Sequence, residues 1–521
     1  MRRVFSAICQ LINVQKRKGK FFITTFIFTS CCFQSPAQTV SQRLDSFFNS
    51  LNDYKQISGS ILIAQNENII TKKYFGFADL QSNIKNSDST EFALASVSKV
   101  FTSTAILQLK EKGKLKLDDA FIKYFPDFPY PDITIRNLLS HTSGLPDYEL
   151  FEKQINENPD KIFTINDVIP SLEIWKQPLN PEPGTKWKYS NTNFCLLALL
   201  VEKVSGLSFQ KYVQQNIFSP LEMHNTFFLN DIPNIKNRNV AINYDHPFLY
   251  SSAYRNVDSM KQYRWRLYNA SGFIGQGNIV TTADDLLKFD EALYSGKLLK
   301  SSTLKEAFTP TKLNNGENTN ADIGIGKASY GLGWFIFNDT TNGKIVWHTG
   351  GQPGALSIFL RNISKKQTVI MFDNNFHKSL YANAVNAMAV LNSEPIITKK
   401  VSLAQDYGSA LTEKGSDAAF CTLQKMQADS AHYYLSEDDM NELGLRLLYE
   451  AKFEGHNELA LEVLKLNTLF FPHSFNTYDS YGEALARTGK KEEAIFMYKK
   501  SLELNPKSEG GKKALEELQK R

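Results

Sequence analysis

Ser96 and Lys99 are three residues apart in the stretch Ala95-Ser96-Val97-Ser98-Lys99, a spacing that suits nucleophilic catalysis. If this stretch is helical, residues i and i+3 share a face, so the lysine amine lies within hydrogen-bond reach of the serine hydroxyl. A buried lysine can lose its proton and act as a base toward the serine. A helix N-terminus also favours the negative charge that then develops. The pair therefore predicts a serine nucleophile activated by a lysine.

The Ser-x-x-Lys spacing alone is a weak signal, because the chain repeats it at Ser82/Lys85, Ser208/Lys211 and Ser302/Lys305. Context separates the first pair from the others. An apolar lead-in, residues 92–95, comes before Ser96, and apolar residues then recur at helical spacing up to Lys112. A glycine follows at position 113, which is typical of a helix end. We therefore expect Ser96 and Lys99 to begin a helix that runs to about Lys112.

Two further triplets fit the same chemistry. Tyr189-Ser190-Asn191 precedes a predicted helix over 192–204, and His348-Thr349-Gly350-Gly351 is expected to end a predicted strand over 344–348. A tyrosine beside the lysine would pass a proton to the leaving group. Asn191 would hold a substrate amide, and the backbone N–H groups of Ser96 and Gly351 would form an oxyanion hole. Each triplet can also be purely structural, because similar patterns recur elsewhere in the chain. They are Tyr381-Ala382-Asn383 and His141-Thr142-Ser143-Gly144.

The elements that would position these residues are of mixed type. Residues 60–64 and 69–78 read as a β-hairpin, and strand patterns return at 330–337, 344–348, 356–361 and 367–372. Helical patterns lie between them, including 192–204 and 282–294. Strands at both ends with helices between predict one α+β unit, closed by a sheet that joins the two ends.

Beyond about residue 395 the pattern becomes continuously helical, and a repeat of 34 residues is visible. The matched pairs are Ala460 and Ala494, Leu464 and Tyr498, Asn467 and Ser501, and Pro472 and Pro506. This period and these residue types are the tetratricopeptide signature, a helix-turn-helix unit that packs on its neighbours. The alternative is two unrelated amphipathic helical hairpins.

The order of the three motifs, together with the blocks at 138–145, 189–194 and 275–286, resembles a known family. That family comprises the serine hydrolases related to class C β-lactamases and serine D-Ala-D-Ala carboxypeptidases, over about residues 45–390. The resemblance implies an antiparallel sheet flanked by helices, with a helical subdomain, and an acyl-enzyme on Ser96. It implies catalytic roles for Lys99 and Tyr189 and substrate-binding or oxyanion roles for Asn191, His348, Thr349, Gly350 and Gly351. The motif order of the family excludes Tyr381.

His348 departs from the family pattern, because lactamases and carboxypeptidases usually carry a lysine there that helps to bind the substrate carboxylate. A histidine with an ordinary pKa of about 6.5 is mostly neutral above neutral pH. The substrate class therefore stays open between a peptide, an amide, an ester and a β-lactam.

The composition fits a folded protein of more than one unit. The chain has 521 residues, of which 42% are hydrophobic and 22% charged. The formal charge of +5 includes six basic residues in the first forty, a stretch without an acid, so the rest of the chain carries −1. A nearly neutral chain of this kind lacks the excess of positive charge that is typical of nucleic-acid-binding proteins.

The first 37 residues are predicted to be an export signal. Basic residues precede an apolar run over 21–33, and Ser35-Pro36-Ala37 offers a cleavage point after Ala37. The mature protein is then periplasmic or secreted. The alternatives are a membrane-anchoring helix, although ~20 apolar residues are needed to span a bilayer, or lipid attachment at Cys31 or Cys32.

The predicted domains are the signal peptide at 1–37, a hydrolase domain at 38–395, a helical linker or partial repeat at 396–435 and tetratricopeptide-like repeats at 436–521. Cys195 and Cys421 stand far apart, and neither the cysteines nor the eight histidines show a metal-binding spacing. No cofactor or metal is predicted. Two functional alternatives to a serine hydrolase stay open. One is a catalytically silent receptor for a cell-wall peptide, and the other is a protein whose repeats bind a partner protein.

Overall fold

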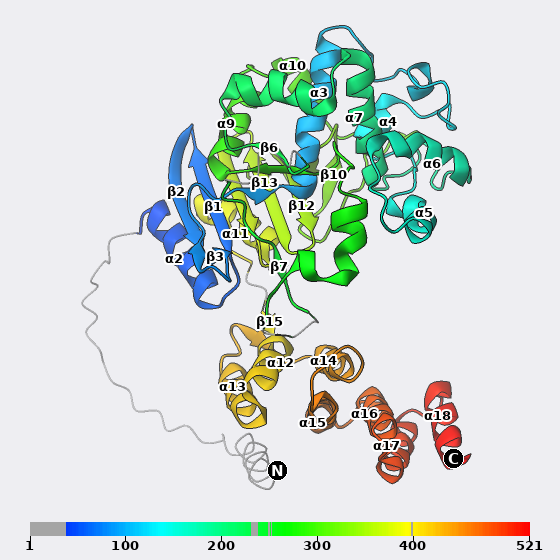
Figure 1. Cartoon of the computed structure of the whole chain (residues 1–521). Helices are drawn as coiled ribbons and strands as arrows, with labels where there is room; N and C mark the ends of the chain where they lie inside the picture. Colours follow the sequence, from blue (N-terminus) through cyan, green and yellow to red (C-terminus); the bar gives the residue numbers. More distant parts are fainter. Residues whose placement is uncertain (1–37, 231–237, 248–250, 252, 398–399, 521) are drawn as a thin grey trace, which may run out of the picture. The chain divides into compact units, whose positions relative to one another are not determined.

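The computed structural model describes residues 38–230, 238–247, 251, 253–397 and 400–520 (Figure 1). The chain divides into two compact units. The first comprises Gln38–Asp245 and Arg255–Ile397, and the second comprises Thr398–Arg521 together with His246–Tyr254. The predicted signal peptide at 1–37 lies outside the described residues, and its export role stays a prediction.

A seven-stranded antiparallel sheet forms the centre of the first unit, in the order β10-β11-β12-β13-β14-β1-β2. Its strands are β1 (Gly59–Gln65), β2 (Asn68–Phe75), β10 (Ala328–Tyr330), β11 (Phe335–Phe337), β12 (Ile345–Gln352), β13 (Ala355–Asn362) and β14 (Gln367–Asp373). The N-terminal hairpin joins the C-terminal strands through β1 and β14, with Ile61 opposite Met371. The prediction of one α+β unit closed by a sheet that joins its two ends is confirmed.

Side chains alternate between the two faces of this sheet, as the pleat of a strand requires. On β1, Ile61 and Ile63 pack with α2 (Val40–Asp53) and α11 (Leu380–Leu391), which cover one face (Figure 1). Leu62 and Ala64 belong instead to the larger core on the opposite face, beneath the other helices. The sheet is therefore buried on both sides, which explains the continuous apolar runs of β1, β13 and β14.

The helices of the larger core carry the motifs. They are the 3-10 helix η1 (Ala95–Ser98), α3 (Lys99–Glu111), α4 (Ile135–Leu139), α5 (Glu152–Glu157), α6 (Val168–Trp175), α7 (Asn191–Ser205), α8 (Phe209–Val213), α9 (Ala283–Tyr294) and α10 (Ser301–Ala307). A small sheet in the order β5-β9-β6, made of Phe92–Ala93, Ile279–Thr281 and Phe227–Phe228, leads directly into η1. Two further strand pairs complete the unit, β3 (Phe77–Asp79) with β4 (Ile84–Lys85) and β7 (Tyr244–Asp245) with β8 (Arg255–Asn256).

Within the described part of the chain, no single helix is long and apolar enough to cross a membrane. One bent pair, Asn191–Ser205 with Phe209–Leu221, meets the criteria of length and composition, with 74° between its two halves. Ten consecutive residues of α7, from Thr192 to Val201, are buried. Packing in a protein core therefore accounts for the apolar character of this pair.

The single strand predicted at 330–337 is wrong, because two strands occupy this range. β10 ends at Tyr330 and β11 begins at Phe335, and the turn between them is closed by the Gly331 N–H, which donates to the Trp334 carbonyl at 2.8 Å. Gly333 has a φ of +85°, which glycine adopts without the steric cost of a side chain. The predicted helix from Ala95 also begins differently, since its first turn is 3-10 rather than α.

The second unit is built from helical hairpins. Its helices are α12 (Leu403–Lys414), α13 (Ser416–Ala428), α14 (Glu437–Tyr449), α15 (His456–Phe470), α16 (Phe475–Arg487), α17 (Lys491–Leu504) and α18 (Glu509–Lys520), with a short parallel pair β15 (Val401–Ser402) and β16 (Tyr433–Tyr434). Successive helices pair as α12 with α13, α14 with α15 and α16 with α17, and α12, α14 and α16 contact one another in turn.

Equivalent positions of the 34-residue repeat make equivalent contacts. Gly444 on α14 lies against Leu464 on α15, and Gly482 on α16 lies against Tyr498 on α17. The matched residues Ala460, Asn467, Ala494 and Ser501 are all fully buried. The region is thus a helical repeat in its packing, while its identity as tetratricopeptide repeats and its binding of a partner stay predictions.

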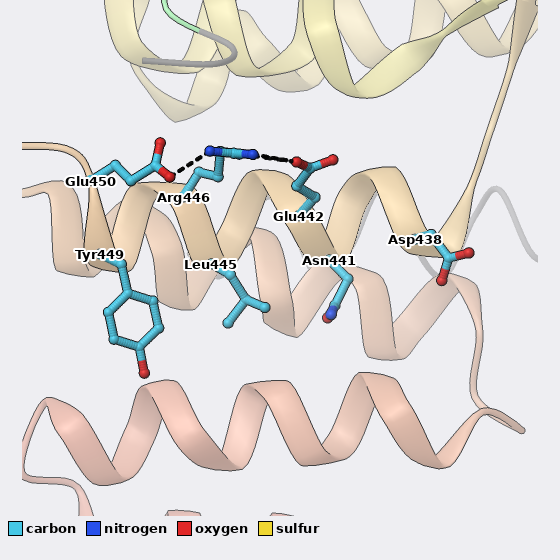
Figure 2. A pocket seen from close by; sticks show the side chains of 7 residues that line it. All are labelled: Asp438, Asn441, Glu442, Leu445, Arg446, Tyr449 and Glu450. Carbon is cyan, nitrogen blue, oxygen red and sulfur yellow. Dashed lines mark hydrogen bonds and ion pairs between the residues drawn. The ribbon is translucent and has the colours of Figure 1, made fainter. Parts of the chain in front are cut away.

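The exposed face of α14 borders a hollow of about 330 Å³ (Figure 2). Its lining residues are Asp438, Asn441, Glu442, Leu445, Arg446, Tyr449 and Glu450. Arg446 forms ion pairs with both Glu442 and Glu450 along the same helix. Exposed pairs of this type contribute about 0.3–0.5 kcal/mol each to helix stability.

We predict that Gly59→Ala destabilises the first unit, because a Cβ at residue 59 would lie 1.9 Å from the Phe372 carbonyl oxygen where β1 pairs with β14. Overpacking of this kind costs about 1–3 kcal/mol. Urea denaturation followed by fluorescence should show a lower midpoint for this unit. Gly277→Ala is the matched control, since its Cβ would meet nothing closer than 3.7 Å. Equal midpoints for Gly59→Ala and Gly277→Ala would contradict the prediction.

Candidate active site

Ser96 and Lys99 lie on consecutive helical elements, η1 and α3, which pack in the core beside the sheet. Ala95, immediately before the serine, has a φ of +44°, a left-handed conformation that is costly for a residue with a Cβ. This conformation turns the chain sharply from β5 into η1. Ser96 remains half-buried, whereas Lys99 is completely buried.

Three oxygen acceptors surround the Lys99 amine. Nζ lies 3.0 Å from Ser96 Oγ, 2.7 Å from Asn191 Oδ1 and 2.8 Å from the Gln276 carbonyl oxygen. The first two distances bring the Ser-x-x-Lys pair and the Tyr-Ser-Asn motif together, as the resemblance implies. The third comes from the loop 275–278, which the sequence analysis treated only as a structural block. The ammonium form of Lys99 therefore has one acceptor for each of its three hydrogens.

The same three partners decide what happens when Lys99 loses a proton. Neutral lysine has two hydrogens and one lone pair. The Gln276 carbonyl and Asn191 Oδ1 can only accept hydrogen bonds, whereas the Ser96 hydroxyl can also donate one. The lone pair of neutral Lys99 must therefore face Ser96, which is the arrangement that a general base requires.

The environment makes that neutral form accessible. Burial lowers the pKa of Lys99 to about 7, while the negative charge of Asp147 opposes this shift and the positive charge of Arg266 adds to it. Burial likewise raises the pKa of Asp147, against hydrogen bonds from Asn191 and the charge of Lys99. Near neutral pH, Lys99 can thus exchange its proton in either direction.

Tyr189 contacts both Ser96 and Lys99. Its hydroxyl hydrogen-bonds with Ser96, and its ring centroid is 5.0 Å from Lys99 Nζ. Burial raises the pKa of Tyr189 far above its usual range, so the phenol keeps its proton. Tyr189 is therefore placed to pass a proton between the serine and a leaving group.

His141 holds Tyr189 in place rather than forming a second strand motif. Its ring is 4.2 Å from the Tyr189 ring, and its Nδ1 accepts the backbone N–H of Ser190 at 3.2 Å. Burial lowers the pKa of His141 well below its ordinary value, so the ring is neutral. The resemblance of His141-Thr142-Ser143-Gly144 to the strand motif is thus a coincidence of sequence.

Asn191 links two charged side chains of the site, and its expected contact with a substrate amide stays a prediction. Its side-chain oxygen accepts from Lys99, and its Nδ2 donates to Asp147 Oδ2 at 3.0 Å. Asp147 Oδ1 also accepts the backbone N–H of Asn191 at 2.9 Å, at the first residue of α7. Asn191 therefore connects Lys99 to a half-buried carboxylate that sequence reasoning missed, because Asp147 is 48 residues from Lys99 and no spacing links the two.

The strand motif lies within β12 and does not end it, so that expectation is corrected. β12 runs to Gln352 because Gly350 and Gly351 continue to pair with Ser357 and Leu356 of β13. A Cβ on Gly350 would lie 2.1 Å from the Leu94 carbonyl oxygen, so only glycine allows β12 to pass this close to the residues before Ser96.

The opposite edge of β12 is open toward its end. β11 pairs only with Val346 and Trp347, so His348–Gln352 have no strand partner on that edge among the described residues. η1 packs against β12, which brings the two expected oxyanion donors, the backbone N–H groups of Ser96 and Gly351, onto neighbouring elements. Thr349 is buried and Gly351 exposed on this strand. Tyr381, which motif order excludes from catalysis, donates from α11 to the Gly350 carbonyl at 2.8 Å and so supports β12.

His348 is buried and neutral. Its Nδ1 lies 2.6 Å from the Thr349 carbonyl and its Nε2 lies 3.2 Å from the Tyr330 hydroxyl. The carbonyl can only accept, so Nδ1 carries the hydrogen and Nε2 accepts from Tyr330. Burial lowers the pKa of His348 to about 3, and the charge of Lys99 adds to this shift. His348 therefore supplies no cation for a substrate carboxylate at neutral pH.

The structure also bears on Cys195 and on possible metal ligands. Cys195 is buried on α7, and burial raises the pKa of its thiol to about 12, which suits a core residue and not a nucleophile. Across the described residues, no three His, Cys, Asp or Glu side chains are grouped so as to hold a metal ion.

This fold and site define a class of proteins in which a serine, a lysine and a tyrosine share one buried centre on an antiparallel sheet. The family model described as Beta-lactamase matches residues 37–391. The chain therefore belongs to the beta-lactamase family, which supports serine hydrolase activity in general.

Individual relatives agree with this assignment. Penicillin-binding protein 4* of Bacillus subtilis is 32% identical over 355 residues, which cover 67% of this chain and 75% of that protein. The crystal structure of a penicillin-binding protein from Bacillus halodurans aligns with a TM-score of 0.54 and 27% identity, over 67% of this chain and 98% of the other. D-amino acid amidase from Ochrobactrum anthropi shares the fold, with a TM-score of 0.54 and 21% identity over 68% of this chain and 98% of its own in one complex.

We predict that the pH dependence of kcat/KM for Ser96-dependent turnover has an acid limb with a midpoint near 7, as Lys99 loses its proton. Asp147→Asn should move that midpoint to lower pH, because the carboxylate stabilises the lysine ammonium. The measurement is a pH profile of wild type and variant on one substrate. Glu149→Gln, which removes an exposed carboxylate two residues away, is the control and should leave the midpoint in place. An Asp147→Asn midpoint at or above that of wild type would refute this account of the pH dependence.

Proposed function

We propose that the protein is an exported serine hydrolase that forms an acyl-enzyme on Ser96 and hydrolyses a peptide, amide or ester. The observation that carries the proposal is the completely buried Lys99 amine, 3.0 Å from Ser96 Oγ, with a pKa lowered to about 7. The basic and apolar character of residues 1–37 supports the export part of the proposal.

In the proposed reaction, Lys99 removes the proton from Ser96 as the hydroxyl oxygen attacks the substrate carbonyl. The backbone N–H groups of Ser96 and Gly351 stabilise the oxyanion. Tyr189, with Lys99, passes the proton to the leaving group, and water then attacks the acyl-serine with the proton moving in reverse. The half-buried Ser96 beside a buried base supports this sequence of steps.

The neutral state of His348 narrows the proposed substrate class. A neutral histidine at the place where related lactamases and carboxypeptidases carry lysine disfavours strong hydrolysis of β-lactams, which carry a carboxylate beside the reactive amide. The named relatives are penicillin-binding proteins and an amidase, which supports a peptide or amide substrate before an ester.

The test is intact mass spectrometry of the protein after incubation with an uncharged fluorophosphonate and, separately, with benzylpenicillin. We expect a fluorophosphonate adduct on Ser96 and a slower or absent benzylpenicillin adduct. Ser96→Ala and Lys99→Ala should each lower ester turnover by about 10³-fold or more, since they remove the nucleophile and its base.

Ser302→Ala and Lys305→Ala are matched controls, because this pair has the same spacing and both side chains are exposed on helix α10. Both should retain the adduct and the turnover. An adduct that persists in Ser96→Ala would refute the assigned nucleophile, and a wild-type protein that forms no adduct and turns over no ester would favour the silent receptor.

A further inference from the structure

Arg266 is a half-buried cation close to this site. It lies on η10 (Trp265–Asn269), a short π-helical segment, and its side chain is half-buried. Its guanidinium carbon is 5.0 Å from the centroid of the Tyr148 ring, which fixes its position from one side. Within the described part of the chain, Arg266 forms no ion pair and donates no hydrogen bond. Its planar fork of donors is thus held in place and left available.

Tyr148 presents a second unsatisfied group beside it. The Tyr148 hydroxyl is buried and has no hydrogen-bond partner among the described residues. Its ring is packed by Trp265 and Phe273, at centroid distances of 5.4 and 6.3 Å, so the side chain cannot simply turn away. A buried hydroxyl without a partner costs about 1–3 kcal/mol. A bound ligand that accepts a hydrogen bond would remove this cost.

These two groups adjoin the catalytic residues. Tyr148 directly follows Asp147, and the charge of Arg266 is close enough to Lys99 to depress its pKa. Asp147, the acid that precedes Tyr148, is already bound twice by Asn191, through its backbone N–H and its side-chain amide. Arg266 is therefore not neutralised from within the site.

We propose that Arg266, together with the Tyr148 hydroxyl, binds a carboxylate of the substrate, so that the enzyme prefers anionic substrates. The proposal rests on the proposed hydrolase function and narrows its substrate class. Guanidinium groups bind carboxylates in a bidentate manner, and a phenol donor completes such a site. The neutral His348 leaves the strand side without a cation, whereas Arg266 supplies one from the helical side of the serine.

The carboxylate can belong to the acyl part or to the leaving group, and matched esters distinguish the two. p-Nitrophenyl glutarate and p-nitrophenyl valerate differ by a carboxylate on an acyl chain of equal length. 3-Carboxyphenyl acetate and phenyl acetate differ by a carboxylate on the leaving group. In the wild type we expect a higher kcat/KM for the anionic member of one pair, carried mainly by KM.

Arg266→Gln should lower that anionic-to-neutral ratio by about tenfold or more. Its effect on the pKa of Lys99 acts on both members of a pair and therefore cancels in the ratio. Arg266→Lys should restore part of the ratio. Arg264→Gln is the control, because Arg264 lies two residues away and is ion-paired to Asp160 on the surface. Ratios that are unchanged in Arg266→Gln for both pairs of esters would overturn the proposal.

A second measurement does not depend on turnover. Glutarate should slow phenylglyoxal modification of Arg266 in the full-length Ser96→Ala protein, read by peptide mass, and should not slow that of Arg264. Protection of Arg266 without any Ser96-dependent ester hydrolysis would retain the anion site and reject the hydrolase. Hydrolysis without protection and without a change in ratio would retain the hydrolase and reject the anion site.

Discussion

The structure of the catalytic unit depends on one buried amine. Removing a lysine ammonium from water is costly, and the folded protein tolerates it only because Ser96, Asn191 and Gln276 supply an acceptor for each hydrogen. These three partners come from η1, from the start of α7 and from the loop before β9, so a single side chain ties together segments up to 177 residues apart. These hydrogen bonds offset the cost of burying the ammonium only in part, and the remaining cost lowers the pKa of Lys99 to about 7. Stability and reactivity are thus two consequences of the same burial.

The sheet and the helical core meet where Leu94 passes β12 and β13. The Leu94 carbonyl accepts the Ser357 hydroxyl at 2.6 Å, and Gly350 leaves the space for that approach. This contact places the serine against the open edge of β12, where a substrate carbonyl can meet both the nucleophile and backbone donors. The strained conformation of Ala95 is held by the same packing, as expected for a backbone outlier at a functional site.

Electrostatics divides the site into two sides. On the sheet side, His348 is neutral because burial and the charge of Lys99 lower its pKa, and the hydrogen bond to the Thr349 carbonyl only partly opposes them. On the helical side, Asp147 and Arg266 act on Lys99 with opposite sign. The two charges therefore shift the pKa of one base in opposite directions, so a substitution at either residue is expected to move it.

The hydrophobic spacing of the sequence alone predicted the α+β architecture, the N-terminal hairpin of β1 and β2, the helices of the motifs and the helical repeat. Such spacing is a local record of which face of a strand or helix is buried. The sequence also identified Ser96, Lys99 and Tyr189 as candidates, because each motif and its helical context lie within a short stretch and the order of the motifs can be read along the chain. Tertiary structure alone decided the rest. Asn191 connects Lys99 to Asp147, and Arg266 lies over the Tyr148 ring, only because the chain is folded. β12 continues through Gly351 because β13 pairs with it. Hydrogen bonds and charge interactions between residues distant in sequence produce no recognisable spacing in the sequence, so they can be seen only in the folded chain.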